Sequence, residues 1–471
     1  MIDIDGRRVL VVGLGSSGEA AAGVLAGLGA RTVLVDSAGA PTHAGAAGAL
    51  EAAGVDVRLA TEIPEDIDSY ELVVTSPGVP DGAAVLQAVR KAGIKVISEL
   101  ELGFRLLEGS TIVAVTGTNG KTTTTGLIAE MLDMPDRRAL ACGNIGTPLV
   151  SLYGKAGRQD VLVCEVSSFQ LANIEQFNAR VAVILNLAPD HFDWHAGMED
   201  YAAAKARLIE NMSADDFLVF NADDQFCVSL ASRARGRTVG FGREPAPGTG
   251  IYLDGTTITT APPLEAGPLM DSTALKLAGA HNVDNVMAAA AAALALGRDR
   301  AEVALKASSF EGLEHRCEPA GAVRGVEFFN DSKATNPHAT LHAVRSFDGP
   351  FVAIMGGRNK GLDFSELAVA LCERLDDGTM VGLVLMGESA PEIADAVLEV
   401  CPKKANGRVV RAADMDESVS KAFQMASPEA SVLFTPACAS FDMYEDYKDR
   451  GRSFKASVGR LAGGGSDARI K

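Results

Sequence analysis

The chain has 471 residues, 47% of them hydrophobic and 22% charged, a length typical of about three domains and a composition that excludes a mainly disordered protein. Its 43 basic and 61 acidic residues give a net charge of −18, which disfavours nucleic acid and anionic membrane surfaces as partners. The longest apolar run, 286–296, is shorter than the roughly 20 residues that span a bilayer, and the first residues lack a signal-peptide layout, so we expect no membrane insertion.

The first hundred residues alternate short apolar runs with alanine-rich stretches. Strands are predicted at 8–12, 32–36, 72–75 and 95–98, and helices at 18–28 and 83–92. This alternation is typical of a parallel sheet with helical crossovers. We therefore expect residues 1–103 to form a Rossmann-like domain.

The segment GLGSSG at 13–18 lies between the first predicted strand and the first predicted helix, and Asp36 ends the next strand. Glycines at this spacing let the backbone approach a phosphate at a helix N-terminus. The pattern favours a nucleotide-like ligand over NAD(P), and a tight turn that packs without a ligand is the alternative. A second turn, Ser76-Pro77-Gly78, also follows a strand, at the edge where parallel sheets bind ligands.

Residues 104–312 are predicted to form a central P-loop ATPase-like domain with a parallel sheet. Strands are expected at 110–116, 161–166 and 181–185, helices at 124–131, 201–210 and 283–296, and a loop or small hairpin at 243–272.

The segment TGTNGKTT at 116–123 follows a strand and precedes a helix, so its backbone N–H groups would point at phosphate oxygens. Lys121 would neutralise the β- and γ-phosphates, and the Thr122 hydroxyl would hold Mg²⁺. Val115 stands where the common pattern has glycine, which makes this a shortened variant of the loop.

Acidic and basic side chains beyond this loop are candidates for its metal. Glu165 ends a predicted strand, and Asp190-His191 and His195 follow the next one, where a second Mg²⁺ ligand would fit. Lys205 lies on a predicted helix. From spacing alone we expect Lys205 to face solvent, because an ammonium group beside a metal ion is repelled.

Residues 313–471 are predicted to form a C-terminal Rossmann-like domain, with strands at 326–330, 351–355, 381–386 and 431–435 and helices between them. The whole chain is thus predicted to be an α/β protein of three domains. Its seven cysteines are dispersed and include no CxxC pair, so we expect reduced, partly buried thiols in a cytoplasmic protein. Separately, we expect the protein to be a monomer.

Nine motifs carry a family resemblance: GTNGKTTTT, GNIG, EVSSFQL, PDHFDWH, AAAKARLIEN, GAHNVDN, EHRCE, NDSKATN and TPACASFD. Together they resemble the Mur ligases, the ATP-dependent amide-forming enzymes of peptidoglycan precursor synthesis, nearly from end to end. The last two motifs and GLGSSG look most like the branch that adds D-glutamate to UDP-N-acetylmuramoyl-L-alanine. The DNPR-like motif of the branches that add diaminopimelate or lysine is absent.

The resemblance implies that the uridine diphosphate part of this substrate and its muramoyl-peptide arm lie in the first domain and at its border with the second. The residues implied to contact them are Gly15, Ser16, Ser17, Asp36, Ser37, Ser76, Gly78 and Asn144. Ala38 stands where relatives often have a basic residue, so one uracil contact differs.

The resemblance also implies an ATP site with two Mg²⁺ ions. The implied ATP-binding residues are Gly117, Thr118, Asn119, Gly120, Lys121, Thr122, Thr123, Asn282, Asn285, Arg316 and Asp331. The implied metal ligands are Thr122, Glu165, His191 and, when carbamylated, Lys205. Carbamylation turns the ammonium group into an anionic oxygen ligand. Lys121, Glu165, His191 and Lys205 form the implied catalytic set.

The resemblance assigns D-glutamate to Lys333, Thr335, Lys360, Ser440 and Tyr447, the last often phenylalanine in relatives. Lysines and hydroxyls suit its two carboxylates. ATP would activate the L-alanyl carboxylate as an acyl phosphate, and the D-glutamate amine would then expel phosphate.

Three alternatives remain open. Another Mur-type amino-acid ligase would keep the fold and the mechanism. An NAD-dependent oxidoreductase would explain the first glycine turn but leaves TGTNGKTT unexplained. A non-catalytic nucleotide-gated switch would bind ATP without amino-acid-dependent phosphate release.

Overall fold

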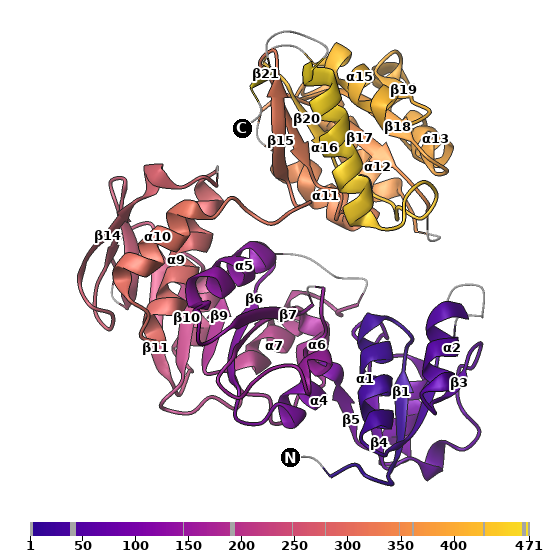
Figure 1. The fold of residues 1–471 in the computed structure, drawn as a ribbon, viewed down its shortest axis with the longest axis vertical. Helices are drawn as coiled ribbons and strands as arrows, with labels where there is room; N and C mark the ends of the chain where they lie inside the picture. The colour runs from indigo at the N-terminus through magenta and orange to yellow at the C-terminus, as the bar shows by residue number, and fades with distance from the viewer. Residues whose placement is uncertain are drawn as a thin grey trace. The chain divides into compact units, whose positions relative to one another are not determined.

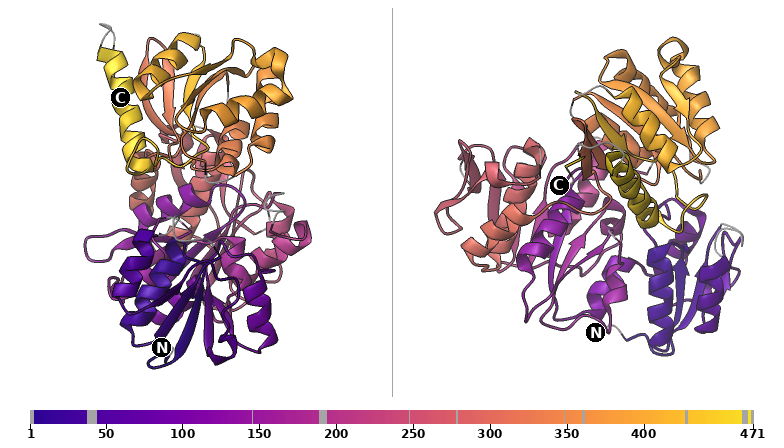
Figure 2. Two further views of the ribbon diagram at one scale, coloured as in Figure 1. Left: turned by 90° about the vertical axis from the view of Figure 1, so that its right-hand side faces the viewer. Right: turned by 45° about the horizontal axis from the view of Figure 1, so that its top comes forward.

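The computed structural model describes residues 3–37, 44–144, 146–188, 194–246, 248–277, 279–347, 349–359, 362–426, 429–463 and 468–469. The chain divides into two compact units, Met1–Phe310 and Glu311–Lys471 (Figures 1 and 2). The first unit contains two β-sheets and the second contains one, which confirms the predicted three-domain α/β class.

The N-terminal sheet is parallel throughout, in the order β3-β2-β1-β4-β5. Its strands are β1 (Arg8–Val12), β2 (Arg31–Val35), β3 (Asp56–Arg58), β4 (Leu72–Thr75) and β5 (Val96–Ser98), and its helices are α1 (Ser16–Gly27), α2 (Ala44–Ala52), η2 (Ile67–Ser69), α3 (Ala84–Lys91) and α4 (Glu99–Leu106). Alternate residues of β1 face opposite layers: Val9 and Val11 pack with α1, α2 and α4, whereas Leu10 and Val12 pack with α3. The sheet is therefore buried on both faces, as its continuous apolar runs indicate.

The central sheet has nine strands in the order β14-β13-β12-β11-β10-β9-β6-β8-β7 and is parallel except at the hairpins β12–β13–β14. Its strands are β6 (Thr111–Thr116), β7 (Ala139–Gly143), β8 (Val161–Glu165), β9 (Val181–Ile184), β10 (Phe217–Asn221), β11 (Arg237–Gly242), β12 (Thr249–Asp254), β13 (Thr257–Thr260) and β14 (Gly267–Asp271). Its helices are α5 (Lys121–Leu132), η3 (Leu149–Leu152), α6 (Ser168–Ala172), α7 (Met198–Ala206), η4 (Arg207–Ile209), α8 (Gln225–Ala231), η5 (Ser272–Ala274), α9 (Ala280–Ala295) and α10 (Arg300–Ser309). The buried alanines at 288–293 let α9 lie close to α5.

The C-terminal sheet has the order β19-β18-β17-β20-β16-β15-β21 and is parallel except for β15 and β21. Its strands are β15 (Glu318–Val323), β16 (Val326–Asn330), β17 (Phe351–Gly356), β18 (Met380–Met386), β19 (Val409–Arg411), β20 (Ser431–Phe434) and β21 (Ala468–Arg469), and its helices are α11 (Pro337–Ser346), α12 (Ser365–Asp376), α13 (Ala390–Val400), α14 (Pro402–Ala405), α15 (Met415–Met425) and α16 (Tyr447–Gly463). Helices α11–α13 cover one face of this sheet, and α15 and α16 cover the other (Figure 1).

Of the two alternatives predicted at 243–272, a loop or a small hairpin, the hairpin is confirmed: β12–β14 pair antiparallel and extend the central sheet. Two other expectations need correction. The helix predicted at 201–210 begins at Met198 and ends as a 3₁₀ turn. Cys372 and Cys401 form a disulfide, so the prediction that all seven cysteines are reduced is wrong for this pair.

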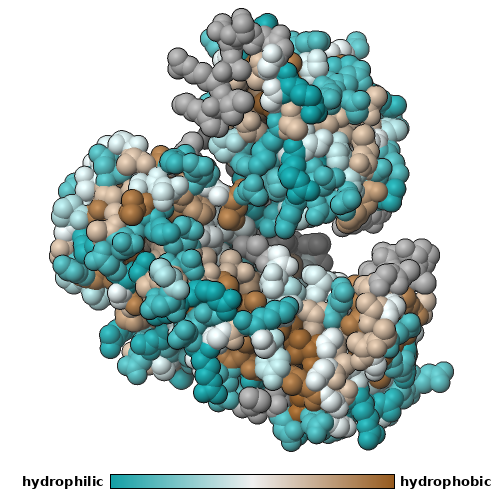
Figure 3. Space-filling model, in the orientation of Figure 1, coloured by the Kyte–Doolittle hydropathy of each residue, from teal (hydrophilic) through white to brown (hydrophobic). Residues whose placement is uncertain are grey.

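The surface is a mosaic of hydrophilic and hydrophobic residues on the face drawn in Figure 3. Among the described residues, no helix has the length and apolar character needed to span a bilayer.

Candidate functional site

The first glycine turn joins β1 to α1 at the carboxyl end of the N-terminal sheet. Leu14 N donates a hydrogen bond to Asp36 Oδ2 at 2.6 Å, and Ser76 Oγ donates to the Gly13 carbonyl at 2.8 Å. A Cβ on Gly18 would lie 1.8 Å from the Gly13 carbonyl oxygen, so only glycine fits there. The ends of β1, β2 and β4 are thereby held around the N-terminus of α1, where ligands of parallel sheets bind.

A cavity of about 640 Å³ opens at this edge, a volume typical of small-molecule sites. Its lining includes all eight residues that the sequence assigns to the first substrate: Gly15, Ser16, Ser17, Asp36, Ser37, Ser76, Gly78 and Asn144. Asn144 follows β7 in the central sheet, so the cavity lies between the two sheets of the first unit.

Gln170 also lines this cavity and was not among the predicted site residues. It is 1% exposed, and its Nε2 has no hydrogen-bond partner among the described residues, whereas its Oε1 accepts from Ser167 N and Oγ at 3.0 Å. A buried donor without a partner is costly unless a ligand supplies the acceptor. The sequence signal was the capping box S-x-x-Q at 167–170, which fixes the side chain but does not reveal the cavity.

The second glycine turn joins β6 to α5 at the carboxyl end of the central sheet. Lys121 Nζ donates to the carbonyls of Gly117 at 2.9 Å and Thr118 at 2.8 Å, so its ammonium group lies against the loop. Gly120 has φ +82°, and a Cβ there would lie 2.3 Å from Asn285 Oδ1. Asn186, which follows β9, accepts from Thr118 N and Asn119 N at 3.1 and 2.8 Å and braces the loop.

The predicted adenine residues belong to α9 and meet the same turn. Asn285 Oδ1 accepts from Thr124 Oγ1 at 3.3 Å, and Asn285 Nδ2 donates to Asn282 Oδ1 at 3.1 Å. The structure therefore brings Asn282 and Asn285 together with the phosphate loop.

Glu165 connects the phosphate loop to the cavity. Its Oε2 accepts from Thr122 Oγ1 at 2.6 Å, and its Oε1 accepts from Asn144 Nδ2 at 2.9 Å. Glu165 is buried, and its carboxylate and the Thr122 hydroxyl are the hard oxygen donors that Mg²⁺ prefers. These two residues fit a magnesium ion that keeps several of its waters.

Lys205 is buried, which corrects the expectation from spacing that it faces solvent. It is 1% exposed, and its Nζ donates to the Gly117 carbonyl at 2.9 Å and to Thr116 Oγ1 at 3.4 Å. The Nζ also lies 4.6 Å from the centre of the Tyr201 ring. Lys205 therefore belongs to the surroundings of the phosphate loop.

Four residues singled out in the sequence, Ala38, Asp190, His191 and Lys360, lie outside the described residues. Within the described ranges, no three His, Cys, Asp or Glu side chains cluster in a way that could hold a metal ion. The candidate metal ligands that the structure places are Thr122, Glu165, Lys205 and His195, and the ring nitrogens of His195 lie 3.0 Å from Asp200 Oδ2 and 2.9 Å from Ser168 Oγ.

In the second unit, Asp331 follows β16 and is buried. Its carboxylate accepts from Cys317 N at 3.3 Å and from Thr435 Oγ1 at 3.1 Å. Burial raises the pKa of Asp331 to about 6, against the positive charge of nearby Arg316. The adjacent residues His315 and Cys317 have φ +63° and +43°, so the loop that carries Arg316 is strained.

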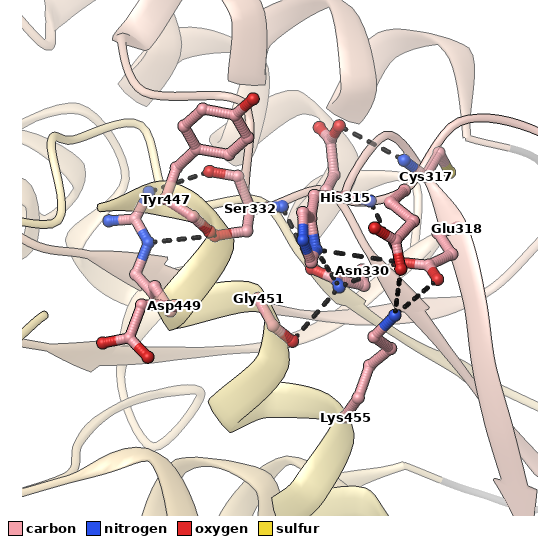
Figure 4. A network of polar contacts seen from close by, with 12 residues as sticks. His315, Cys317, Glu318, Asn330, Ser332, Tyr447, Asp449, Gly451 and Lys455 are labelled. Carbon is pink, nitrogen blue, oxygen red and sulfur yellow. Dashed lines mark hydrogen bonds and ion pairs between the residues drawn. The ribbon is translucent and has the colours of Figure 1, made fainter. Parts of the chain in front are cut away.

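Lys333, Thr335 and Ser440, three of the residues predicted to bind D-glutamate, lie on two loops that Arg450 joins. Its Nε and Nη2 donate to the hydroxyl and carbonyl of Ser332 at 3.1 and 2.9 Å, and its Nη1 donates to the Cys438 carbonyl at 2.9 Å. Ser332 Oγ donates in turn to the Tyr447 carbonyl at 2.8 Å (Figure 4). Lys333 and Thr335 follow Ser332, and Ser440 follows Cys438, so the structure brings these predicted residues to one end of the C-terminal sheet.

Helix α16 closes this cluster from one side. Figure 4 shows Gly451 and Lys455 of α16 beside His315 and Asn330. Asn330 Nδ2 contacts His315 Nδ1 at 3.0 Å and donates to the Gly451 carbonyl at 3.3 Å, and burial lowers the pKa of His315. The loop at 315–318 is therefore fixed to both β16 and α16.

Three family profiles match consecutive parts of the chain. They are described as the Mur ligase MurD-like N-terminal domain (7–98), the Mur ligase middle domain (115–293) and the Mur ligase glutamate ligase domain (315–438). Each match falls on one of the three sheets, and β21 and most of β6 lie outside the matched ranges.

Curated relatives are similar over nearly the whole chain. One from Pelotomaculum thermopropionicum is 41% identical over 97% of this chain and 98% of its own, and one from Koribacter versatilis is 38% identical over 98% and 99%. Both are named UDP-N-acetylmuramoylalanine–D-glutamate ligase.

Solved structures share the fold at low identity. MurF from Acinetobacter baumannii has a TM-score of 0.55 at 16% identity over 91% of this chain and 90% of its own. UDP-N-acetylmuramate–alanine ligase MurC from Thermotoga maritima has 0.54 at 19% identity over 97% and 100%.

Proposed function

The chain belongs to the Mur ligase family, and on that premise we propose that it joins D-glutamate to UDP-N-acetylmuramoyl-L-alanine at the expense of ATP. The observation that carries this proposal is the position of Glu165. Its two carboxylate oxygens are bonded to Thr122 of the phosphate loop and to Asn144 of the cavity wall. An acceptor held in the cavity would thus present its free end to the nucleotide phosphates.

The cavity suits a nucleotide-diphosphate substrate. The N-terminus of α1 offers backbone N–H groups to a diphosphate, and Asp36 and the turn at 76–78 close the side at which a nucleoside would sit. Gln170 Nε2 supplies a donor for an oxygen of the arm that leads toward Glu165. The cavity is proposed to hold the nucleotide-linked substrate and not the incoming amino acid. The residues that select the amino acid therefore lie outside this cavity.

The reaction requires two anions to meet. The γ-phosphoryl group passes from ATP to the L-alanyl carboxylate, forming an acyl phosphate and ADP, and the D-glutamate amine then forms the amide and expels phosphate. Lys121 lies where it can neutralise charge on the phosphates. Mg²⁺ held by Thr122 and Glu165 would shield the remaining charge. Asn144, an amide donor on the cavity wall beside Glu165, would orient the reacting carboxylate.

Lys205 and His191 complete the proposed metal ligands. Carbamylation of Lys205 would replace a buried ammonium with an anionic oxygen donor beside Gly117. His191 is assigned by its place in the PDHFDWH motif alone.

The second unit is proposed to supply the amino-acid site and part of the nucleotide site. Lys333, Thr335, Lys360, Ser440 and Tyr447 are assigned to D-glutamate, and Arg316 and Asp331 to phosphate and ribose. The Arg450 bridge supports this assignment because it fixes the two loops that carry most of the D-glutamate residues relative to one another. We place the enzyme in the cytoplasm, where ATP and nucleotide-linked precursors are available.

The deciding experiment measures phosphate release from ATP and Mg²⁺ with UDP-N-acetylmuramoyl-L-alanine and one amino acid at a time. D-Glutamate, L-glutamate, L-lysine and diaminopimelate are compared at equal concentration. We expect release with D-glutamate alone. Phosphate release with one of the other three amino acids would assign the protein to a different step of the same pathway. No phosphate release with any of the four would contradict the proposal.

A further inference from the structure

Three polar side chains connect α6 to α7 beside the phosphate loop. His195 Nε2 lies 2.9 Å from Ser168 Oγ at the start of α6, and His195 Nδ1 lies 3.0 Å from Asp200 Oδ2 in the first turn of α7. Ser168 and His195 are 1% and 4% exposed. The two helices lie side by side (Figure 1).

The partners fix the direction of the protons in this Ser168–His195–Asp200 relay. A carboxylate only accepts hydrogen bonds, so neutral His195 carries its proton on Nδ1 and donates it to Asp200. Nε2 is then an acceptor, and the Ser168 hydroxyl donates to it. Asp200 also accepts from Ala196 N at 3.3 Å, which holds the carboxylate in place.

The same three residue types catalyse acyl transfer in serine hydrolases. Ser168 differs from a hydrolytic serine because its side chain is buried at a helix start, where no substrate carbonyl can approach its Oγ. A positional role for the relay follows from its surroundings.

The relay continues to the phosphate loop through α7. Tyr201 follows Asp200 directly, and its hydroxyl lies 3.2 Å from Thr118 Oγ1. Its ring centre lies 5.2 Å from that of His195 and 4.6 Å from Lys205 Nζ, one helical turn further along. The position of α7 therefore sets the positions of both Tyr201 and Lys205 at the loop.

On the other side, Ser168 lies three residues after Glu165 on the segment that leaves β8. The cap residue of α7 is Gly197, which has no side chain to cap the helix, and the buried residues of α7 are Tyr201, Ala204 and Lys205. The relay adds directed hydrogen bonds to the packing contacts that α6 and α7 also share.

We propose that His195 is a positioning residue that holds the Glu165 side and the Lys205 side of the phosphate loop in register through the Ser168–His195–Asp200 relay. This inference rests on the proposed ligase function for its catalytic consequence. Its structural content, a single imidazole tautomer that couples α6 to α7, does not depend on which amino acid is added.

The sharpest variants are Asp200→Asn, Ser168→Ala and the double variant. The amide introduced by Asp200→Asn can donate to His195 Nδ1 and so favours the opposite tautomer, with little change of shape. We expect each single variant to lower kcat about tenfold, the usual scale for a residue behind a metal site, and to leave the KM of the UDP substrate unchanged. The double variant should be no worse than either single one, since both break one relay. Multiplying losses would overturn the proposal.

Two His195 variants separate the ends of the relay. Asn places an amide near the Nδ1 position and Gln near the Nε2 position, so His195→Asn keeps the Asp200 bond and His195→Gln keeps the Ser168 bond. Both should retain more activity than His195→Leu. Phe169→Leu is the matched packing control, because Phe169 stacks on the imidazole at 5.7 Å without joining the relay. An equal loss of activity in Phe169→Leu would show that His195 acts only through packing, which would overturn the proposal.

Two further readouts need no turnover. Nitrogen-15 NMR of histidine-labelled full-length protein should show His195 protonated at Nδ1, with the resonance identified by its loss in His195→Asn; the opposite tautomer would overturn the proposal. Calorimetric titration with Mg²⁺ and a non-hydrolysable ATP analogue should show about tenfold weaker binding in Asp200→Asn. Both readouts stand if phosphate release fails with every amino acid, which would contradict the proposed function alone.

Discussion

The two glycine turns of the first unit have the same backbone design and different side chains. Each follows a parallel strand, opens a helix and excludes any side chain at one position, Gly18 in the first and Gly120 in the second. At the first, the nearest acid, Asp36, accepts a loop N–H and faces a cavity. At the second, Lys121 follows the turn, and Glu165 accepts from Thr122.

This difference separates holding an anion from reacting with it. Backbone N–H groups at a helix N-terminus suffice to bind phosphate, as the first turn is equipped to do. Phosphoryl transfer also needs a cationic side chain and a metal ligand beside the phosphates, and of the two turns only the second has both. Variants at the second turn should therefore lower the rate, whereas variants at the first should lower substrate affinity.

Lys121→Met should give the largest effect. Removing the ammonium group while keeping the length of the side chain leaves the phosphates without their main protein cation, so we expect kcat to fall about 10³-fold with the KM of the UDP substrate nearly unchanged. Steady-state phosphate release measures both. Lys155→Met, at an exposed lysine of the same domain, is the control and should behave as wild type. A Lys121 variant that loses only UDP-substrate affinity would break the comparison.

Glu165→Gln should have the next largest effect and lower kcat about 10- to 100-fold, the usual range for a weakened metal site. The amide keeps bonding capacity toward Thr122 and Asn144 but removes the negative charge that suits Mg²⁺. Part of the loss should return at high Mg²⁺, which a titration at saturating ATP would show. Glu130→Gln is the charge-matched control. Glu130 lies on α5 and forms an exposed ion pair with Lys306 of α10. Equal Mg²⁺ curves for the two variants would argue against Glu165 as a ligand.

Gly18→Ala tests the first turn. The new Cβ would collide with the Gly13 carbonyl at 1.8 Å and displace the turn, so the KM of the UDP substrate should rise about tenfold or more while the KM of ATP stays constant. Gly23→Ala is the matched control on the same helix. Its Cβ would meet only Leu50 at 3.9 Å, and it should stabilise α1 by about 0.5–1 kcal/mol. A rise in the ATP KM for Gly18→Ala would show that the two turns are not independent.

The sequence predicted the fold where burial leaves a continuous signal. Strands such as β1 and β4 were predicted at their observed bounds because parallel strands that are covered on both faces appear in the sequence as unbroken apolar runs. The short strand β7 and the hairpins β12–β14 carry mixed Ala, Thr and Gly patterns, which spacing alone does not distinguish from loops.

The site shows the same division. Contiguous motifs revealed the two turns, because their glycines, lysine and threonines act within a few residues of one another. The burial of Lys205, the orphaned Gln170 amide and the Cys372–Cys401 disulfide each depend on segments that meet only in the folded chain. No local pattern encodes such meetings, so family resemblance or coordinates are needed to find them.

The smallest expected effect concerns helix α4, which connects the N-terminal sheet to the central sheet. Glu99 is completely buried there, and its Oε1 accepts from Val150 N of η3 at 2.7 Å, whereas its Oε2 has no hydrogen-bond partner in the part of the chain that the structure describes. Burial raises the pKa of Glu99 from 4.5 to about 7. The folded state therefore binds a proton more tightly than the unfolded chain does, and stability falls as the pH rises from about 4.5 to about 7.

Glu99→Gln imitates the protonated form at every pH. It should match wild type at about pH 4, below the pKa of the unfolded chain, and be more stable above pH 7, by about 3 kcal/mol at most. Thermal unfolding from about pH 4 to pH 8.5 checks this, with an expected gain of a few degrees at the alkaline end. Glu101→Gln is the contrast: this buried carboxylate accepts from Glu175 N, Gln176 N and Phe177 N, so losing its charge should destabilise the protein. If both variants shift stability in the same direction, the buried Oε2 of Glu99 is not the cause of the pH dependence.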